Sequence, residues 1–292
     1  MNSRTLCVFF LAATLGLTSA NAAITFTVSF TAQAQSDLSP AEQALFTDAI
    51  QFWDDIIDGH RDGINRAWNL SVDTFSTAAS GGSITLGSAG PGSVAFSQPV
   101  AGLALDVTWN SNRFIYSTSG SSNFNVHPDA GALQAATIRH EIGHALGIGT
   151  LWEDNGLYTD GVVNPNREGS GSPGQFNGPA ALAAFQAEFD PGASFVPVEL
   201  NGSGGTAHGH WNEADSALFG DAGSAIIAIS GPGTGLSMDD ELMTGSLSSP
   251  NWISNTTIAS LYDLGFTLHT IPEPGTIAFL GLALLLPIRR RR

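Results

Sequence analysis

The chain of 292 residues has 26 acidic and 10 basic residues and a formal net charge of −16. Such an acidic chain repels phosphate backbones, which argues against nucleic acid as a partner. Its single cysteine, Cys7, lies near the N-terminus, so we expect neither a disulfide framework nor a thiolate metal site in the mature protein. Any metal ligand must then be His, Asp or Glu.

The first 22 residues have the features of a secretory signal peptide in the usual order. Arg4 precedes the apolar run CVFFLAATLGL, and small residues follow at 20–22. We therefore predict an export signal over residues 1–22, cleaved before Ala23, in preference to a buried N-terminal helix. Residues 23–270 are long enough for one large domain or for two lobes.

A strand and a helix are the first predicted elements of this domain. ITFTVSF at 24–30 alternates polar and apolar residues, which indicates a strand. Next, Ser39 suits an N-cap, Pro40 the first turn and Glu42 a capping box. The apolar positions of this helix indicate packing on a sheet; they are Leu45, Ile50, Phe52, Trp53 and Ile56. An early strand and helix favour an α+β domain.

The rest of the chain gives weaker local signals. Residues 70–118 are rich in Gly, Ser and Thr, with strand-like pieces SITL and LALDVTW. Residues 155–180 are loop-like, and the sequence ALAAFQAEF after them is helical in character. ISNTTIASLYDLGF predicts a closing helix that ends at Gly265.

The stretch HEIGHALGIG at 140–149 carries the strongest chemical signal. DAGALQAATIRHEIGHALG is good helix sequence, with Asp129 as a candidate cap. Positions four apart are neighbours on a helix, so His140 and His144 can offer two imidazoles to one zinc ion. Glu141 lies about 100° around the helix and can take a proton from a metal-activated water that attacks a carbonyl. This is the pattern of HExxH metallopeptidases, although a motif this short also occurs by accident.

Two further features of this stretch restrict the site. A glycine inside a helix costs about 1 kcal/mol relative to alanine, so Gly143 indicates that another segment packs closely there. Two histidines do not complete a catalytic zinc site, which needs a third protein ligand and an open position.

HEIGHALGIGTLW resembles a metzincin zinc peptidase: Gly147 matches the glycine that ends the metzincin helix, but Thr150 stands where the third histidine is usual. Longer segments resemble the leishmanolysin-like branch, which inserts a long segment before its third ligand. The matching segments are GQFNGPAALAAFQ (174–186) for the insert, HWNEADS (210–216) for the third ligand, DDELMTGSLSS (239–249) for the Met-turn and TTIASLYDLGF (256–266) for the closing helix.

This resemblance spans roughly residues 130–268 and implies an α+β, metzincin-like zinc peptidase domain, with a twisted sheet, an active-site helix and a long insert before the third ligand. It implies one catalytic zinc ion and a secreted endopeptidase that acts on protein or peptide substrates. The implied ligands are His140, His144 and His210, with Glu141 as general base and Met243 as the hydrophobic floor beneath the metal.

His208 remains an alternative to His210. Two residues apart in an extended segment point to the same side, so geometry alone does not choose between them. Trp211, which follows His210, matches the His-Trp of the leishmanolysin-like family and favours His210 as the ligand.

The C-terminus, residues 271–292, resembles the PEP-CTERM sorting signals of Gram-negative bacteria that form exopolysaccharide. Pro272-Glu273-Pro274 is followed by an apolar run from Thr276 to Ile288 and four arginines. As a helix this run would span about 20 Å, short of the ~30 Å hydrocarbon core of a membrane. The resemblance implies removal by an exosortase-type enzyme after transient membrane contact, and a protein of the cell envelope or the extracellular space. The peptidase domain then covers residues 23–270, with lobes at about 23–148 and 149–270.

Several alternatives remain open. A gluzincin-type site would use Glu168 as third ligand, and a non-catalytic envelope or biofilm-matrix protein would need no site at all. Asp154-Asn155-Gly156 and Asp160-Gly161 could bind calcium, but their spacing lacks the full ligand set of an EF-hand, and short acidic turns are common. The remaining histidines are expected on the surface, in loops or beside the tail; they are His60, His127 and His269.

Overall fold

The structure is a computed structural model. It describes residues 23–81, 84–100, 112–160, 162–163, 171–172, 174–200, 206–212, 235–245 and 251–269. The expected signal peptide and the sorting tail therefore lie outside the described residues, as do LALDVTW and Glu168. Among the helices described, none is long and apolar enough to cross a membrane.

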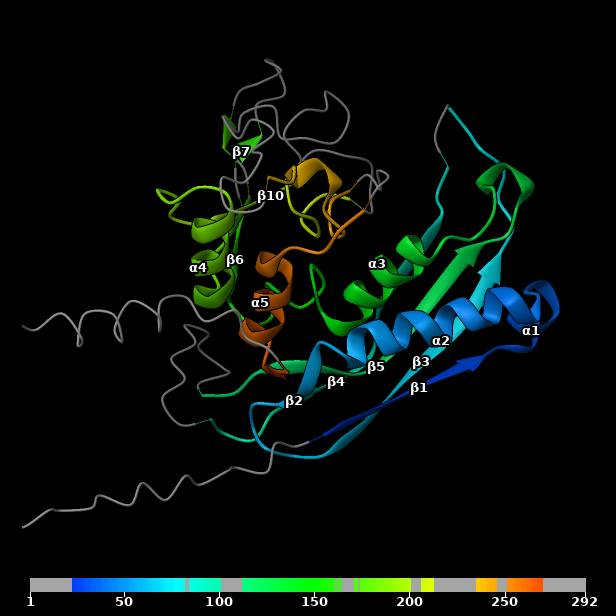
Figure 1. The fold of residues 1–292 in the computed structure, drawn as a ribbon, viewed down its shortest axis with the longest axis horizontal. Coiled ribbons are helices and arrows are strands. Elements are labelled where there is room, and N and C mark those ends of the chain that lie inside the picture. Colours follow the sequence, from blue (N-terminus) through cyan, green and yellow to red (C-terminus); the bar gives the residue numbers. More distant parts are fainter. Residues whose placement is uncertain are drawn as a thin grey trace, which may run out of the picture.

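The N-terminal half begins with β1 and ends with α3 (Figure 1). Its elements are β1 (Ile24–Phe30), α1 (Ala32–Asp37), α2 (Pro40–Asp54), β2 (Ile57–His60), β3 (Arg66–Phe75), β4 (Gly87–Phe96), β5 (Ile115–Asn125), η1 (Pro128–Ala130) and α3 (Ala135–Leu146). The described part of the C-terminal half has shorter strands, two α-helices and one short 3₁₀ helix. Its elements are β6 (Tyr158–Thr159), β7 (Val162–Val163), β8 (Gly171–Ser172), β9 (Gly174–Phe176), α4 (Pro179–Glu188), β10 (Val196–Val198), η2 (Met238–Asp240), α5 (Asn255–Asp263) and β11 (Phe266–Leu268).

A twisted four-stranded sheet in the order β1-β3-β5-β4 forms the base of the first half. The strands β1, β3 and β5 are parallel, and β4 runs antiparallel at the edge. Alternate residues of β3 point into the core, and Trp68, Leu70 and Val72 are buried there. Each buried side chain of this size contributes about 1.5–3 kcal/mol. The mixed helices and sheet confirm the expected α+β class.

The helices α2 and α3 lie side by side over one face of this sheet (Figure 1). The α2 residues Phe46 and Trp53 are fully buried, and the ring of Phe46 packs edge-on against Phe124 of β5. The Trp53 indole N–H donates to the carbonyl of Arg139 in α3, 3.0 Å away. The sheet and α2 thus hold α3 from two sides.

In the second half, α4 and α5 cap one another through buried carboxylates. Asp263, at the end of α5, accepts from the backbone N–H groups of Ala180 and Ala181 at the start of α4. Glu188, at the end of α4, accepts from the backbone N–H of Asn255 at the start of α5. Both helices therefore find partners for N–H groups that have none within a helix.

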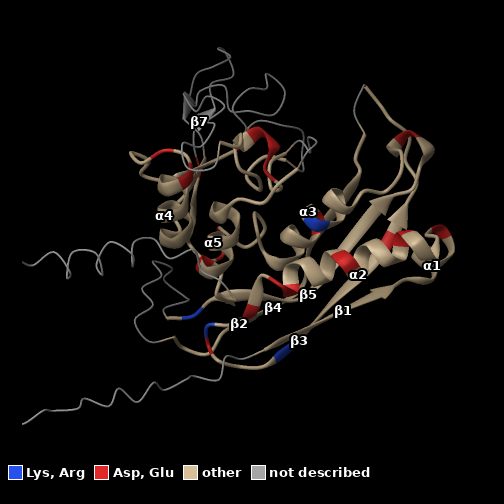
Figure 2. Cartoon of the chain, viewed as in Figure 1, with Lys and Arg blue, Asp and Glu red and all other residues tan. Residues whose placement is uncertain are grey.

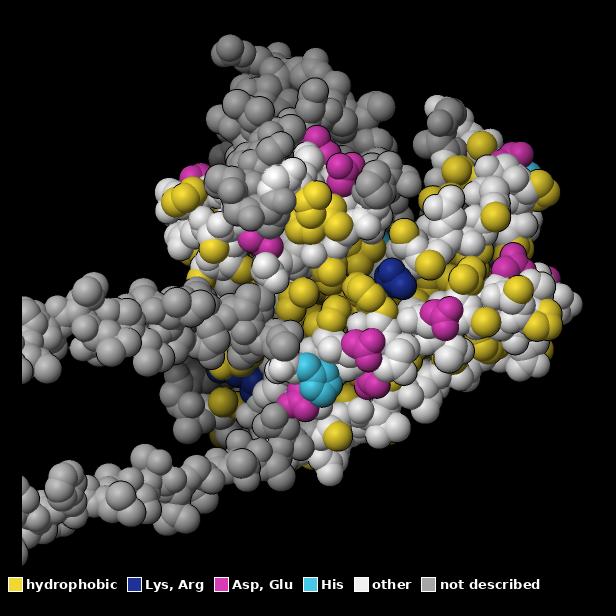
Figure 3. Space-filling model, in the orientation of Figure 1, with side chains coloured by type: hydrophobic (Ala, Val, Ile, Leu, Met, Phe, Trp, Pro, Cys, Tyr) yellow, Lys and Arg dark blue, Asp and Glu magenta, His cyan; other side chains and the backbone are white. Residues whose placement is uncertain are grey.

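The two halves meet over an apolar contact. In Figure 3 hydrophobic side chains gather in the middle of the visible face, between α2 and α5. The partly buried side chains that pack against the core come from both halves and include Phe52 and Tyr262. Acidic side chains are spread over both halves, whereas basic ones are few (Figure 2).

Several predicted elements are confirmed. The strand at 24–30 is β1, and α2 starts with the full capping box of Ser39 and Glu42, with Pro40 at its first turn. ALAAFQAEF lies in α4, and the closing helix α5 is followed by Gly265 with a φ of +99°. Two expectations were wrong. Residues 84–86 of SITL form no strand, and the stretch 155–180, expected to be loop-like, contains the short strands β6, β7, β8 and β9.

Candidate metal centre

The helix α3 carries the HExxH residues and is buried over most of its length. It begins at Ala135, and its N-cap Gln134 makes no side-chain capping bond. The prediction that Asp129 caps this helix was wrong, because Asp129 belongs to the short helix η1. Gly131 follows η1 with a φ of +72°, a backbone that interrupts helical geometry. The helix therefore has to start again further along the chain.

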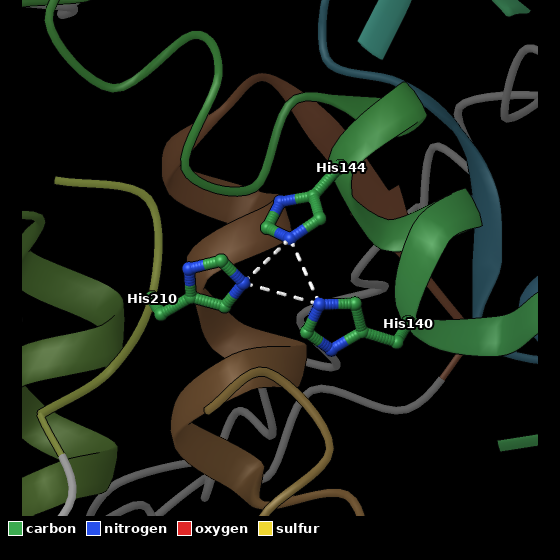
Figure 4. A group of neighbouring side chains, drawn as sticks. All are labelled: His140, His144 and His210. Carbon is green, nitrogen blue, oxygen red and sulfur yellow. Dashed lines mark hydrogen bonds between the residues drawn. The ribbon is translucent and has the colours of Figure 1, made fainter. Parts of the chain in front are cut away.

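Three histidines converge at one point (Figure 4). His140 and His144 come from successive turns of α3, and His210 comes from the segment 206–212. Their Nε2 atoms lie 3.0 to 3.1 Å from one another, and all three side chains are buried. The structure thus brings together the three residues that the sequence nominated as ligands.

The other ring nitrogen of each histidine contacts a backbone carbonyl. The Nδ1 of His140 lies 2.6 Å from Leu242 O, and that of His144 lies 2.8 Å from Ile148 O. The Nδ1 of His210 lies 2.6 Å from the carbonyl oxygen of residue 206. A carbonyl oxygen only accepts, so each Nδ1 must donate its proton. In a neutral ring the Nε2 then carries a lone pair directed at the other two.

This arrangement fits a metal ion. Burial lowers the pKa of all three rings, to about 3 for His140, so they are neutral at pH 7. Three lone pairs that face one another repel, and a cation that accepts all three removes the repulsion. A tetrahedral ion with nitrogen ligands at ~2.0–2.1 Å places those nitrogens roughly 3.3 Å apart, close to the distances found here. The cluster is able to hold a metal ion, and its geometry alone does not identify the metal.

Glu141 is buried next to the first residue of the edge strand β4. A Cβ added to Gly87 would lie 3.1 Å from Glu141 Oε1, so the carboxylate faces the backbone of β4. Burial raises the pKa of Glu141 to about 8. A carboxylate with a raised pKa is a stronger proton acceptor than an exposed one, and a nearby cation favours its ionised form.

The close packing expected at Gly143 is confirmed, and Met243 provides it. A Cβ added to Gly143 would lie 2.7 Å from Met243 Sδ and 3.0 Å from Met243 Cε. Met243 is fully buried, and its carbonyl accepts from the backbone N–H of Trp211 at 3.0 Å. Met243 therefore packs on α3 and is tied to the segment that carries His210.

Two glycines after α3 let the segment with His210 come close. Gly147 has a φ of +122° and ends the helix, so that the chain turns and Ile148 O meets His144. Gly149 has a φ of +76°, and a Cβ there would collide with the backbone of Gly209. This role of Gly149 was not predictable from the sequence, because no local pattern indicates it.

His208 and Thr150 stay outside the cluster. The side chain of His208 is about half exposed, and its Nδ1 lies 2.7 Å from Tyr158 Oη. The hydroxyl of Thr150 donates to His144 O at 2.7 Å and so ties the turn to the helix end.

Two other residues singled out in the sequence, His60 and Asn155, are buried and are not part of the histidine cluster. The expectation of a surface or loop position for His60 was wrong: it is buried in β2 between the rings of Tyr116 and Phe266. The side chain of Asn155 is fully buried and bonds the backbone N–H and carbonyl of Ile115. Its oxygen is therefore already used within the protein. Among the described residues, the three histidines form the only group of three or more candidate ligand side chains.

Comparison with models of known protein families and with curated protein sequences found no match.

Proposed function

We propose that this chain is an exported zinc endopeptidase of the leishmanolysin-like metzincin type. The observation that carries the proposal is the convergence of His140, His144 and His210. Glu141 follows His140 in α3 and is buried. Three neutral imidazoles and an open position are the donor set of catalytic zinc. The metal is proposed to be zinc because imidazole ligands suit it and the described cluster has no thiolate or carboxylate member.

In this proposal each residue has one task. Bound zinc supplies Lewis acidity, which polarises a peptide carbonyl and activates a water molecule. Glu141 accepts a proton from the attacking water and passes it to the leaving amine. Burial raises the pKa of Glu141, and the charge of a bound zinc ion would favour the ionised form that accepts the proton. The carbonyls behind the histidines keep each Nε2 unprotonated.

The setting of the enzyme follows from the two ends of the sequence. The proposed signal peptide exports the chain, and the proposed sorting tail is removed by an exosortase-type enzyme in a Gram-negative host. The substrate is then a protein or peptide of the envelope or the extracellular space.

The test is the variant Glu141→Gln, assayed with casein or a quenched fluorescent peptide. We expect a loss of activity of about 10²- to 10⁴-fold, because the general base is removed. Zinc content should stay near that of the wild type, since all three histidines remain. Glu153→Gln, an exposed glutamate after the α3 turn, is the matched control and should keep full activity.

Turnover by Glu141→Gln within a few-fold of the wild type contradicts the proposed role of the base. A wild-type protein that holds zinc but cleaves neither substrate supports the alternative of a non-catalytic envelope or biofilm-matrix protein.

A further inference from the structure

Glu241 is a fully buried carboxylate close behind the metal centre. Its Oε2 accepts from the backbone N–H of Met243 at 2.5 Å. Its Oε1 accepts from the backbone N–H of Ser254 at 2.9 Å, from the Ser254 hydroxyl at 3.0 Å and from the Thr257 hydroxyl at 2.6 Å. One side chain therefore joins the Met243 turn to the first turn of α5.

The first connection leads to His140. Glu241 holds the N–H of Met243, and the N–H of Leu242 donates to Trp252 O at 2.7 Å. The backbone on both sides of the Leu242 carbonyl is thereby fixed. That carbonyl accepts from His140 Nδ1 at 2.6 Å and sets the direction of the ring.

The second connection leads to His210. The Thr257 hydroxyl that donates to Glu241 also accepts from the indole N–H of Trp211 at 2.7 Å. Trp211 follows His210 in the chain, is fully buried and stacks on Trp152 with ring centroids 4.6 Å apart. The position of this indole fixes the backbone from which His210 extends.

The surroundings of Glu241 favour a role beyond capping. The pKa of Glu241 is raised, because the effect of burial exceeds the opposite effect of its four hydrogen bonds. Among the described residues no Lys or Arg forms an ion pair with it. A buried carboxylate is costly without a compensating charge. The bond from Glu241 to the Met243 N–H gives it such a role, because that N–H and the Leu242 carbonyl belong to one peptide group and the carbonyl is the outer partner of His140.

We propose, on the basis of the metal centre proposed above, that Glu241 is a positioning residue that orients His140 and His210 together. It acts through the Leu242 carbonyl on one side and through Thr257 and Trp211 on the other. Its removal should loosen two of the three ligands at once.

Glu188 provides a matched comparison. It is also buried, and it caps the same end of α5 through the N–H groups of Asn255 and Thr256 and the Thr256 hydroxyl. Among the described residues, the hydrogen bonds of Glu188 reach neither the turn at Met243 nor Trp211. Loss of capping alone should affect Glu188→Gln and Glu241→Gln alike, whereas loss of ligand positioning should affect Glu241→Gln only.

The experiment measures zinc affinity by competition with a chromogenic chelator, and the visible spectrum of the cobalt-substituted protein. We expect Glu241→Gln to weaken zinc binding about 10- to 100-fold, the usual effect of losing an outer partner of a metal ligand. Its cobalt bands should shift, while those of Glu188→Gln should match the wild type. Equal zinc affinities and identical cobalt spectra in the two variants would overturn the proposal.

Should Glu241→Gln fail to fold, the pair Thr257→Val and Thr256→Val gives the same comparison. Thr257→Val removes a hydroxyl that donates to Glu241, and Thr256→Val removes one that donates to Glu188. Thr257→Val should then weaken zinc binding and Thr256→Val should not; no difference between them also overturns the proposal. A wild type that binds zinc but cleaves no peptide refutes the peptidase and leaves the role of Glu241 standing. A wild type that binds neither zinc nor cobalt refutes both.

Discussion

Two buried polar regions of this protein differ in how their hydrogen bonds are completed. Where α4 meets α5, each carboxylate accepts from backbone N–H groups of the opposite helix. In the histidine cluster the Nδ1 of each ring donates to a backbone carbonyl. The Nε2 of each ring points its lone pair at the Nε2 atoms of the other two rings. The first region is complete as it stands and has a structural role. The second has three acceptors and no donor, which is the arrangement of a site made for a cation.

The variant pair His210→Ala and His208→Ala should give the largest difference. His210→Ala removes one of the three proposed ligands, so zinc affinity should fall by more than the ~10- to 100-fold typical of outer partners. Activity should be lost with it. His208→Ala should keep both zinc and activity, because that side chain points to Tyr158 rather than to the cluster.

Zinc content and peptide hydrolysis, measured on both variants after purification, decide between them. If His210→Ala keeps its zinc and His208→Ala loses it, then His208 rather than His210 is the third ligand. If neither variant loses zinc, the leishmanolysin-like interpretation fails.

His60 is a buried histidine that does not belong to the histidine cluster, so the two can be compared. Neither ring nitrogen has a hydrogen-bond partner among the described residues. Burial, with a further contribution from the charge of Arg66 that Asp62 partly opposes, lowers the pKa of His60 to about 4. Unlike the cluster histidines, it is expected to show itself only in the pH dependence of stability.

The depressed pKa sets the direction of that dependence. Above pH ~6.5 His60 is neutral in both states, so its contribution is fully present. As the pH falls from ~6.5 to ~4, the unfolded chain binds a proton that the folded protein does not, and about 3 kcal/mol of stability is lost. His60→Phe should remove this part of the slope, and the half-exposed His269→Phe should not. Urea unfolding between pH 4 and 7 measures it, and equal slopes in the wild type and His60→Phe would contradict the burial of a neutral ring.

The smallest expected effect is at the contact of Gly143 with Met243. A methyl group at Gly143 would overlap Met243 Sδ, and overpacking of this kind costs about 1–3 kcal/mol. The higher helix propensity of alanine returns at most about 1 kcal/mol. Gly143→Ala should therefore lower the free energy of unfolding, and the loss should be smaller in the background Met243→Ala. Chemical denaturation of the wild type, both single variants and the double variant measures this. If the two changes in the free energy of unfolding simply add, Met243 does not contact Gly143.

Local features were predictable from the sequence where local chemistry decides the structure. The capping box at Ser39 needs only residues three positions apart, and the pair His140 and His144 needs only helical spacing. The start of α3 was not predictable in the same way. Asp129 is a good cap by type, but the positive φ of Gly131 ends the first turn before the helix can continue.

Features that depend on residues far apart in the sequence could not be predicted without the fold. His60 looks like a loop histidine in the sequence. Its burial depends on Tyr116 and Phe266, which come from strands that are far from it in the sequence. The role inferred for Glu241 depends on contacts with residues 13 and 16 positions away and, through Thr257, with Trp211. No pattern within one segment carries that information.

The most direct test of the central claim is the zinc coordination of the purified mature protein, by metal analysis and X-ray absorption spectroscopy. We expect one zinc per chain, with imidazole nitrogens at ~2.0–2.1 Å as its protein ligands. We also expect His210→Ala to lose one imidazole from that shell. A mature protein that binds no zinc after equilibration with the metal, or a zinc shell that is the same with and without His210, would contradict the central claim.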